Sequence, residues 1–89
     1  MPYILQNRRT LLRPHIDALV SQLQTIEKDG SREGDINYTI SKLMQLMYPV
    51  AKYSEYNAAY GMLMCCAAEY YRTVIAPYED KKVRDNGSV

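Results

Sequence analysis

The sequence predicts an all-α fold: a small bundle of three main helices plus a short C-terminal helix, assembled as an oligomer. Apolar residues recur at spacings of three and four through most of the 89-residue chain, and this period is typical of amphipathic helices. Proline and glycine stand where such segments would begin or end. One segment, NAAYGMLMCCAA at 57–68, contains no charged residue. Because a helix that is apolar all round is normally buried all round, this segment predicts the oligomer.

The length and composition of the chain predict a single domain over residues 1–89. The chain is 47% hydrophobic and 24% charged, as is usual for soluble globular proteins. Its net charge is only +1, whereas nonspecific binding to nucleic acid phosphates calls for a larger basic excess. The uncharged segment is shorter than the roughly 20 residues that span a bilayer, and no secretory signal opens the chain. We therefore expect a cytoplasmic protein without nucleic acid or membrane partners.

The first thirteen residues, MPYILQNRRTLLR, are expected to form an N-terminal arm, extended at first and then a turn or short helix at 7–12. Pro14 suits the first position of a helix, where its missing N–H costs nothing. Asp29 and Gly30 would end this helix. We predict a first helix at 14–28. Its helical period is carried by Ile16, Leu19, Val20, Leu23 and Ile26.

A polar loop, DGSREG at 29–34, separates this helix from the next. Asp35 is a suitable N-cap, because its carboxylate can accept hydrogen bonds from the exposed N–H groups of the first turn. Pro49 prevents the helix from continuing. We predict a second helix at 35–48, with a coiled-coil-like spacing of four, three and four along one face. That face consists of Ile36, Ile40, Leu43 and Met47.

The third helix, predicted at 54–75 with Ser54 as its cap, contains the uncharged segment. Gly61 in its middle costs about 1 kcal/mol relative to Ala, and the close approach of another backbone would offset this. We expect this face to meet a second copy in a homodimer or higher oligomer; the alternative is a tight monomer closed by its own arm and tail. The predicted interface residues are Ala58, Gly61, Cys65, Ala68, Tyr60 and Met64.

Two further features accompany this helix. Cys65 and Cys66 are adjacent within the apolar pattern and are expected to be buried, reduced thiols. Pro77 suits a first helical position again and predicts a kink and a short fourth helix at 77–85. Acidic residues at its start, basic residues at its end and the Asn86-Gly87 pair behind it match the polarity of a helix.

Catalytic and metal chemistry find little support in the residues. The only histidine, His15, stands near a helix start, so neither a nucleophile–base pair nor a His/Cys metal site is predicted, and no cofactor is expected. All-α nucleotide pyrophosphohydrolases resemble this chain in size, helical content and oligomeric habit. Their magnesium-binding Glu-x-x-Glu and Glu-x-x-Asp pairs are absent here, and we therefore expect a protein that is not an enzyme.

Anion binding has more support. Arg8, Arg9 and Arg13 precede the first acid, Asp17, and arginine suits bidentate contact with phosphate. The predicted helix start at Pro14 adds free N–H groups, and tyrosine rings nearby could stack on a base. The alternatives are a solvated basic arm, or pairing of these arginines with acids of a neighbouring subunit.

Three segments resemble an uncharacterised family of short prokaryotic and phage-borne proteins: the opening MPYI, GDINYTIS at 34–41, and EYYRTVIAPYEDKKVRDNGSV at 69–89. The family has the same opening, a Gly-acid-apolar-Asn-Tyr box, and a closing Glu-aromatic-Tyr-Arg followed by Pro-Tyr-Glu-Asp-Lys-Lys and Asn-Gly. Ser88 replaces an acid of the family pattern. The resemblance singles out Asn37, Tyr38, Glu69, Tyr71, Arg72, Pro77, Tyr78, Glu79, Asp80, Asn86 and Gly87.

Together these observations predict a non-catalytic, self-associating binding module that holds or sequesters an anionic, nucleotide-like ligand near its subunit interfaces. If a phage encodes it, removal of a nucleotide signal in the host cytoplasm would serve anti-defence. One alternative is a phage-borne inhibitor or adaptor that binds a host protein; another is a magnesium-dependent enzyme like the pyrophosphohydrolases. The predicted ligand-binding residues are Arg8, Arg9, Asn37, Tyr38, Glu69, Tyr71, Arg72, Tyr78 and Glu79.

Overall fold

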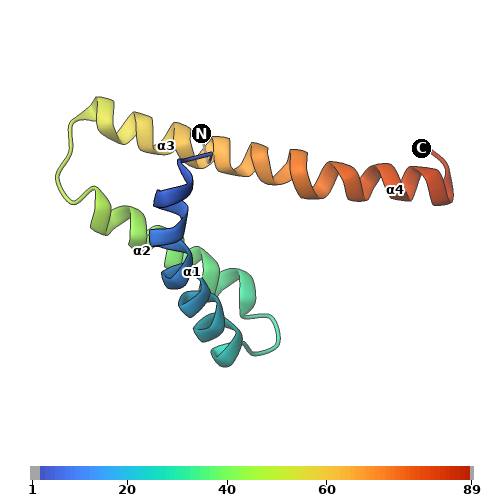
Figure 1. The fold of residues 1–89 in the computed structure, drawn as a ribbon, viewed down its shortest axis with the longest axis horizontal. Coiled ribbons are helices and arrows are strands. Elements are labelled where there is room, and N and C mark those ends of the chain that lie inside the picture. The colour runs from blue at the N-terminus through green and yellow to red at the C-terminus, as the bar shows by residue number, and fades with distance from the viewer. Residues whose placement is uncertain (1–2, 89) are drawn as a thin grey trace. The chain divides into compact units, whose positions relative to one another are not determined.

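The chain is helical along most of its length, and the all-α prediction is confirmed (Figure 1). A computed structural model describes residues 3–88, and no strand occurs among them. Met1, Pro2 and Val89, which belong to the predicted opening and closing motifs, lie outside the described residues. The chain divides into two compact units, residues 3–52 and 53–88. The elements are α1 (Gln6–Ile26), α2 (Arg32–Met47), α3 (Tyr53–Tyr70), the π-helix η1 (Tyr71–Ile75) and α4 (Ala76–Asn86).

Helix α1 begins earlier than the sequence predicts. The expected arm at 1–13 is helical from Gln6, and Pro14 lies inside the helix rather than at its first position. Leu, Arg and Gln in this stretch are good helix formers, and Leu5 O accepts from the N–H groups of Arg8 and Arg9. Pro14 cannot donate to the carbonyl four residues before it, but the ion pair from Arg13 Nε to Asp17 Oδ1, at 2.7 Å, spans that position.

The turn between α1 and α2 is tighter than the predicted loop. Helix α1 ends at Ile26, because Glu27 takes an extended backbone with φ −62° and ψ 132°. The N–H of Ser31 then donates to Lys28 O at 3.0 Å, which closes a four-residue turn. Gly30 stands at the third position of this turn with φ +78°, the left-handed region that such a turn requires there. Glycine thus serves the turn itself and not the helix end.

Helix α2 starts three residues before the predicted cap. Ser31 is the N-cap, and Asp35 lies one turn inside the helix, where its N–H donates to Ser31 O. Asp35 as N-cap was therefore wrong, since the tight turn leaves Arg32 already helical. At the other end, the N–H of Tyr48 donates to Met44 O, and Pro49 follows as predicted.

In the second unit α3, η1 and α4 follow one another without a break in the helix, shown from yellow to red in Figure 1. Helix α3 begins at Tyr53, so Ser54 lies within it. Five residues of π-helix replace the expected boundary at Pro77, and the N–H of Ala76 donates to Tyr71 O, five residues back. Because Pro77 has no N–H and its ring would crowd the Thr73 carbonyl in an α-helix, the wider turn suits this position. Gly87, with φ +82°, ends α4 by donating to Val83 O, as predicted.

Neither unit has an appreciable core. Among residues 3–88 only Ala59, which is 6% exposed, is buried. Large apolar side chains on every α-helix remain exposed to solvent, from Leu12 and Ile16 on α1 to Met64 on α3 and Val83 on α4. Within each unit, the helices therefore leave much of their apolar faces exposed.

Candidate functional site

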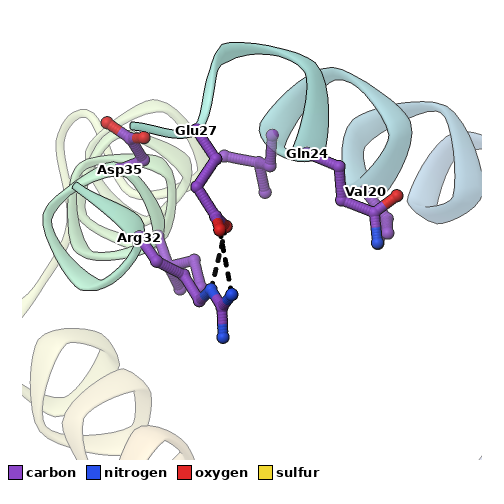
Figure 2. A pocket seen from close by; sticks show the side chains of 7 residues that line it. Val20, Gln24, Glu27, Arg32 and Asp35 are labelled. Carbon is purple, nitrogen blue, oxygen red and sulfur yellow. Dashed lines mark hydrogen bonds and ion pairs between the residues drawn. The ribbon is translucent and has the colours of Figure 1, made fainter. Parts of the chain in front are cut away.

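A cleft of about 540 Å³ opens between the ends of α1 and α2, beside their turn (Figure 2). Its apolar lining comes from both helices, and its charged lining comes from the two sides of the turn. The lining residues are Val20, Leu23, Gln24, Glu27, Arg32, Asp35 and Ile36.

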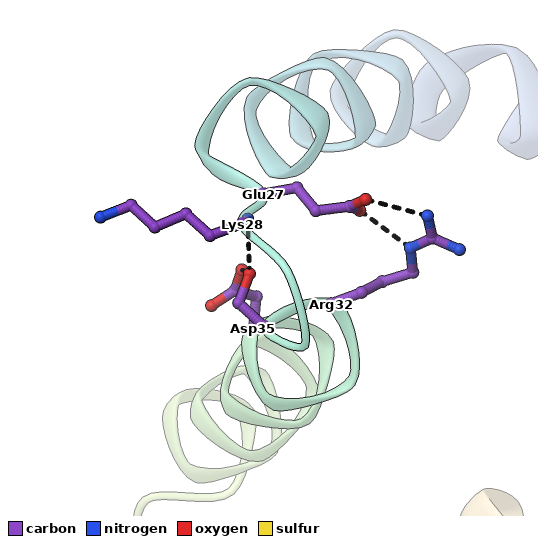
Figure 3. Close-up of polar contacts among 5 residues, drawn as sticks. Glu27, Lys28, Arg32 and Asp35 are labelled. Carbon is purple, nitrogen blue, oxygen red and sulfur yellow. Dashed lines mark hydrogen bonds and ion pairs between the residues drawn. The ribbon is translucent and has the colours of Figure 1, made fainter.

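A bidentate ion pair closes the rim of this cleft. Arg32 donates from Nε to Glu27 Oε1 at 2.8 Å and from Nη2 to Glu27 Oε2 at 2.9 Å (Figure 3). The hydrogen bond from Arg32 lowers the pKa of Glu27, and the same bond raises the pKa of Arg32. Two planar groups joined in this way hold a fixed geometry, so the pair ties the last residue before the turn to the first residue of α2.

A second set of hydrogen bonds fixes the inner side of the turn. Ser31 Oγ accepts from the Lys28 N–H at 2.9 Å and donates to Asp35 Oδ2 at 3.1 Å (Figure 3). Ser31 and Asp35 are both half-buried. The Asp35 carboxylate was expected to cap the backbone of the helix. It accepts a hydrogen bond from the side chain of Ser31 instead.

The chemistry of the cleft favours an apolar occupant over an anion. Val20, Leu23 and Ile36 supply its apolar walls, while Glu27 and Arg32 neutralise each other. No nucleophile lies beside a base in this lining. Residues 3–88 hold no group of three or more His, Cys, Asp or Glu side chains placed to bind a metal ion together. The cleft thus combines apolar walls with a rim of hydrogen-bonded charged side chains.

The predicted ligand residues of the second unit interact mainly with one another. Tyr71 donates its hydroxyl to Glu79 Oε1 at 2.5 Å, and this bond raises the pKa of Tyr71. Arg72 pairs with Glu69, with Nε 3.4 Å from Oε2 and a closer contact from Nη2 to Oε1. Lys82 Nζ lies over the Tyr78 ring, 5.5 Å from the ring centroid.

The π-helix explains why Tyr71 reaches Glu79. A π turn holds an additional residue compared with an α turn. Residues eight apart that span it therefore share a face, as residues seven apart do in a regular α-helix. The Glu-aromatic-Tyr-Arg box and the following Pro-Tyr-Glu-Asp segment are connected by this geometry.

The predicted ligand residues of the first unit lie outside the cleft. Arg8 and Arg9 occupy the first turn of α1, and Arg9 Nε donates to Ile4 O at 2.7 Å. Asn37 accepts a hydrogen bond from Ser41 Oγ at 3.1 Å, and Tyr38 is exposed. The helix start predicted at Pro14 is wrong, because α1 begins at Gln6; the positive end of the helix lies beside Arg8 and Arg9.

The predicted interface residues form an open face of α3. Ala58, Gly61, Cys65 and Ala68 are exposed, as are Tyr60 and Met64. A Cβ placed on Gly61 would meet no other atom within 4 Å. Cys65 and Cys66 are free thiols and exposed, so the expectation that they are buried is wrong for the chain by itself.

Sequence reasoning missed the residues that close the cleft, namely Glu27, Arg32 and Gln24. A usable signal existed, since opposite charges at 27 and 32 flank the Gly30 turn. The pairing of Glu27 with Arg32 could be predicted only if the tight turn were known. The predicted loop at 29–34 would leave Arg32 outside any helix.

A family model described as Domain of unknown function (DUF6899) matches residues 1–89, and the chain belongs to that family. This confirms the resemblance to an uncharacterised family. No curated protein and no solved structure matches the chain. Among the helices of residues 3–88, none combines the length and apolar character needed to cross a bilayer.

Proposed function

We propose that this member of DUF6899 is a non-catalytic binding module that works as a homo-oligomer and completes its hydrophobic core with further copies of itself. The observation that carries the proposal is the single buried residue, Ala59, among residues 3–88. Folding loses conformational entropy that apolar burial has to offset. Each unit leaves its large apolar side chains exposed, and we assign the missing burial to further copies of the chain.

The accessible surface area shows how much apolar burial the two units lack. The two units together have 8132 Å² of accessible surface. Two separate globules of the sizes of the two units would together expose about 6,400 Å². About 1,700 Å² per chain remains beyond even that value. A standard protein interface covers about 800 Å² per partner, so the surplus is about twice the area of one standard interface.

The open face of α3 is the first surface we assign to self-association. Gly61 costs the helix about 1 kcal/mol relative to Ala, and no contact within the chain offsets that cost. Small residues at Ala58, Cys65 and Ala68 extend the same face. A second α3 crossing there would bring two helix backbones close together and cover Tyr60 and Met64 at the flanks.

The first turn of α1 supports the ligand part of the proposal, an anionic, nucleotide-like molecule. Arg8 and Arg9 lie at the end of a helix where N–H groups and the helix dipole favour negative charge. No acidic residue stands in that turn. Two guanidinium groups beside the positive helix end repel each other and the dipole, and a bound phosphate would relieve both.

Native mass spectrometry of the full chain, supported by sedimentation velocity, tests the assembly. We expect a mass of at least two 10.3 kDa chains at micromolar concentration. A single chain that carries a different bound protein would favour the alternative of an inhibitor or adaptor and would overturn the homo-oligomer.

A nucleotide panel tests the ligand. Binding to the native state raises the melting temperature by mass action, and we expect a rise for phosphate-bearing members. The double variant Arg8→Gln/Arg9→Gln should lose the rise, while Arg84→Gln in the last turn of α4 should keep it. A flat response across the panel would remove the ligand from the proposal and leave the assembly standing.

A further inference from the structure

The α1–α2 hairpin carries a second apolar surface, distinct from the open face of α3. Since α1 begins at Gln6, Leu12 joins the apolar residues that follow it at spacings of four, three, four and three. Helix α2 repeats four, three and four. These are the spacings of a coiled coil. The hairpin seam, as we name this surface, consists of Leu12, Ile16, Leu19, Leu23 and Ile26 on α1 and Ile36, Ile40, Leu43 and Met47 on α2.

The hairpin does not cover its own seam. Ile16 is 52% exposed on α1, and Leu43 is 56% exposed on α2. Two helices can cover each other along only one line, so the remaining width of each apolar face stays open. The cleft, with Val20, Leu23 and Ile36 in its walls, is part of that opening.

Resting on the proposed homo-oligomer, we infer that the hairpin seam binds the hairpin seam of a second copy and forms a four-helix bundle about a two-fold axis. In such a bundle four helices surround one apolar core with this residue spacing. A two-fold interface brings the same surface of each chain against itself. The seams of two copies have identical spacing, so their layers can interleave along the shared length.

The charges around the cleft favour a second copy over a charged ligand or peptide. Glu27 and Arg32 satisfy each other in a bidentate pair, and Asp35 accepts from Ser31. A helix that covers the cleft would therefore bury the Glu27 and Arg32 charges as a pair, and Asp35 would keep its hydrogen bond from Ser31. With Glu27 and Arg32 paired, Asp35 leaves one negative charge in the lining, which disfavours a phosphate or an acidic segment.

The surplus of exposed area agrees with this assignment. About 1,700 Å² per chain exceeds the area of about 800 Å² that one standard interface covers on each partner. The open face of α3 and the hairpin seam together account for it better than either surface alone. Two different two-fold surfaces on one chain would give an assembly larger than a dimer.

Sedimentation velocity and circular dichroism of the full chain, with two variants of α2, test the inference. Ile40→Lys places a charge in the hairpin seam, whereas Gln45→Lys places the same charge on the opposite, exposed face of the helix. We expect Ile40→Lys to lower the assembled mass at least twofold and Gln45→Lys to leave it unchanged.

The outcomes separate this inference from the proposed function. A wild-type chain that sediments as one 10.3 kDa species overturns both. If the wild type is assembled and Ile40→Lys keeps its mass, the α3 assembly stands, and the hairpin seam has another occupant, which overturns the four-helix bundle.

If Ile40→Lys loses its helical signal, the milder variant Ile40→Ala is measured in its place at several protein concentrations. Mass and helical signal that rise together with protein concentration support the inference, because both then depend on the second copy. A helical signal that stays low at every concentration contradicts it.

Discussion

The two units of the chain obtain their shape in different ways. Residues 3–52 form a hairpin whose turn is tied by side chains, with the bidentate Glu27–Arg32 pair on its rim and Ser31 bonded to Asp35 inside. Residues 53–88 form consecutive helices whose polar contacts, such as Tyr71 with Glu79, join positions along the same helical run. The hairpin thus fixes a fold-back within the chain, whereas the apolar face of α3 has no such partner within its own unit.

This difference shows what each kind of contact can supply. Exposed ion pairs and hydrogen bonds set local geometry but add little to stability. Burial of apolar area supplies most of the stability of a folded domain, and neither unit buries much apolar area within itself. Changes to the turn should therefore act weakly, and changes to the apolar faces should act strongly.

The largest effect is expected at the open face of α3. Gly61→Leu places a bulky side chain where a second backbone should approach, and we expect it to reduce the assembled mass in sedimentation velocity. Gly61→Ala serves as the graded control. On an uncovered helix it would raise stability by about 1 kcal/mol, whereas at a close helix crossing it should weaken assembly. Unchanged sedimentation of Gly61→Leu would contradict the α3 interface.

The next largest effect is expected at Pro14 in the hairpin. Its ring removes the N–H that would donate to Thr10 O and strains the helix interior. Pro14→Ala should restore that bond and raise the free energy of unfolding by about 2 kcal/mol, after allowance for the greater freedom of the unfolded chain. Urea unfolding at fixed protein concentration measures it. A variant less stable than wild type would mean that Pro14 has a packing role.

A smaller effect is expected at Pro77 in the second unit, because the π-helix already accommodates this proline. Pro77→Ala permits an ordinary α-helix, which would move Glu79 away from Tyr71. We expect the pKa of Tyr71 to fall toward its ordinary value in an NMR titration of its ring. Glu79→Gln, which removes the charge without changing the backbone, should lower it too. A Tyr71 pKa unaffected by Pro77→Ala would contradict the link between proline and π-helix.

The smallest effect is expected at the turn of the hairpin. The pKa of Glu27 is lowered by Arg32, so this pair adds stability above the ordinary glutamate pKa. That contribution is lost as pH falls through the lower, folded-state value. Urea midpoints between pH 7 and pH 3 should decline less in Glu27→Gln than in wild type. Glu33→Gln, beside Arg32, should retain the wild-type decline; equal slopes in all three proteins would count against the pair.

Much of the fold was predictable from local signals. Apolar periodicity located the main helices, Pro49 ended one of them, and Asn86-Gly87 ended the last. Each of these features depends on a residue's own backbone preference, which the sequence displays directly.

The errors arose where one residue suits two positions. Pro14 is compatible with a helix start or with a strained interior, and only the helix-forming residues before it decide. Asp35 is compatible with an N-cap or with the first turn of a helix, and the tight turn at Gly30 makes Ser31 the cap. The π-helix depends on the balance between a missing N–H at Pro77 and the strong helix around it, which residue spacing does not reveal.

The candidate site was less predictable than the fold. The cleft exists only because the turn brings Glu27 to Arg32, and neither residue belongs to a recognised motif. Tyr71 and Glu79 were singled out by resemblance to the family, but their contact depends on the additional residue of the π turn. A contact that depends on backbone geometry cannot be predicted from the spacing of the residues in the sequence.

The claim that further copies complete this protein's fold is tested most directly by the urea midpoint of the wild-type chain at two protein concentrations a hundredfold apart. If folding and association are coupled in a dimer, the apparent free energy of unfolding should rise by about 2.7 kcal/mol at the higher concentration, and the midpoint should rise with it. The same midpoint at both concentrations would show that a single chain folds unaided, and would contradict the account.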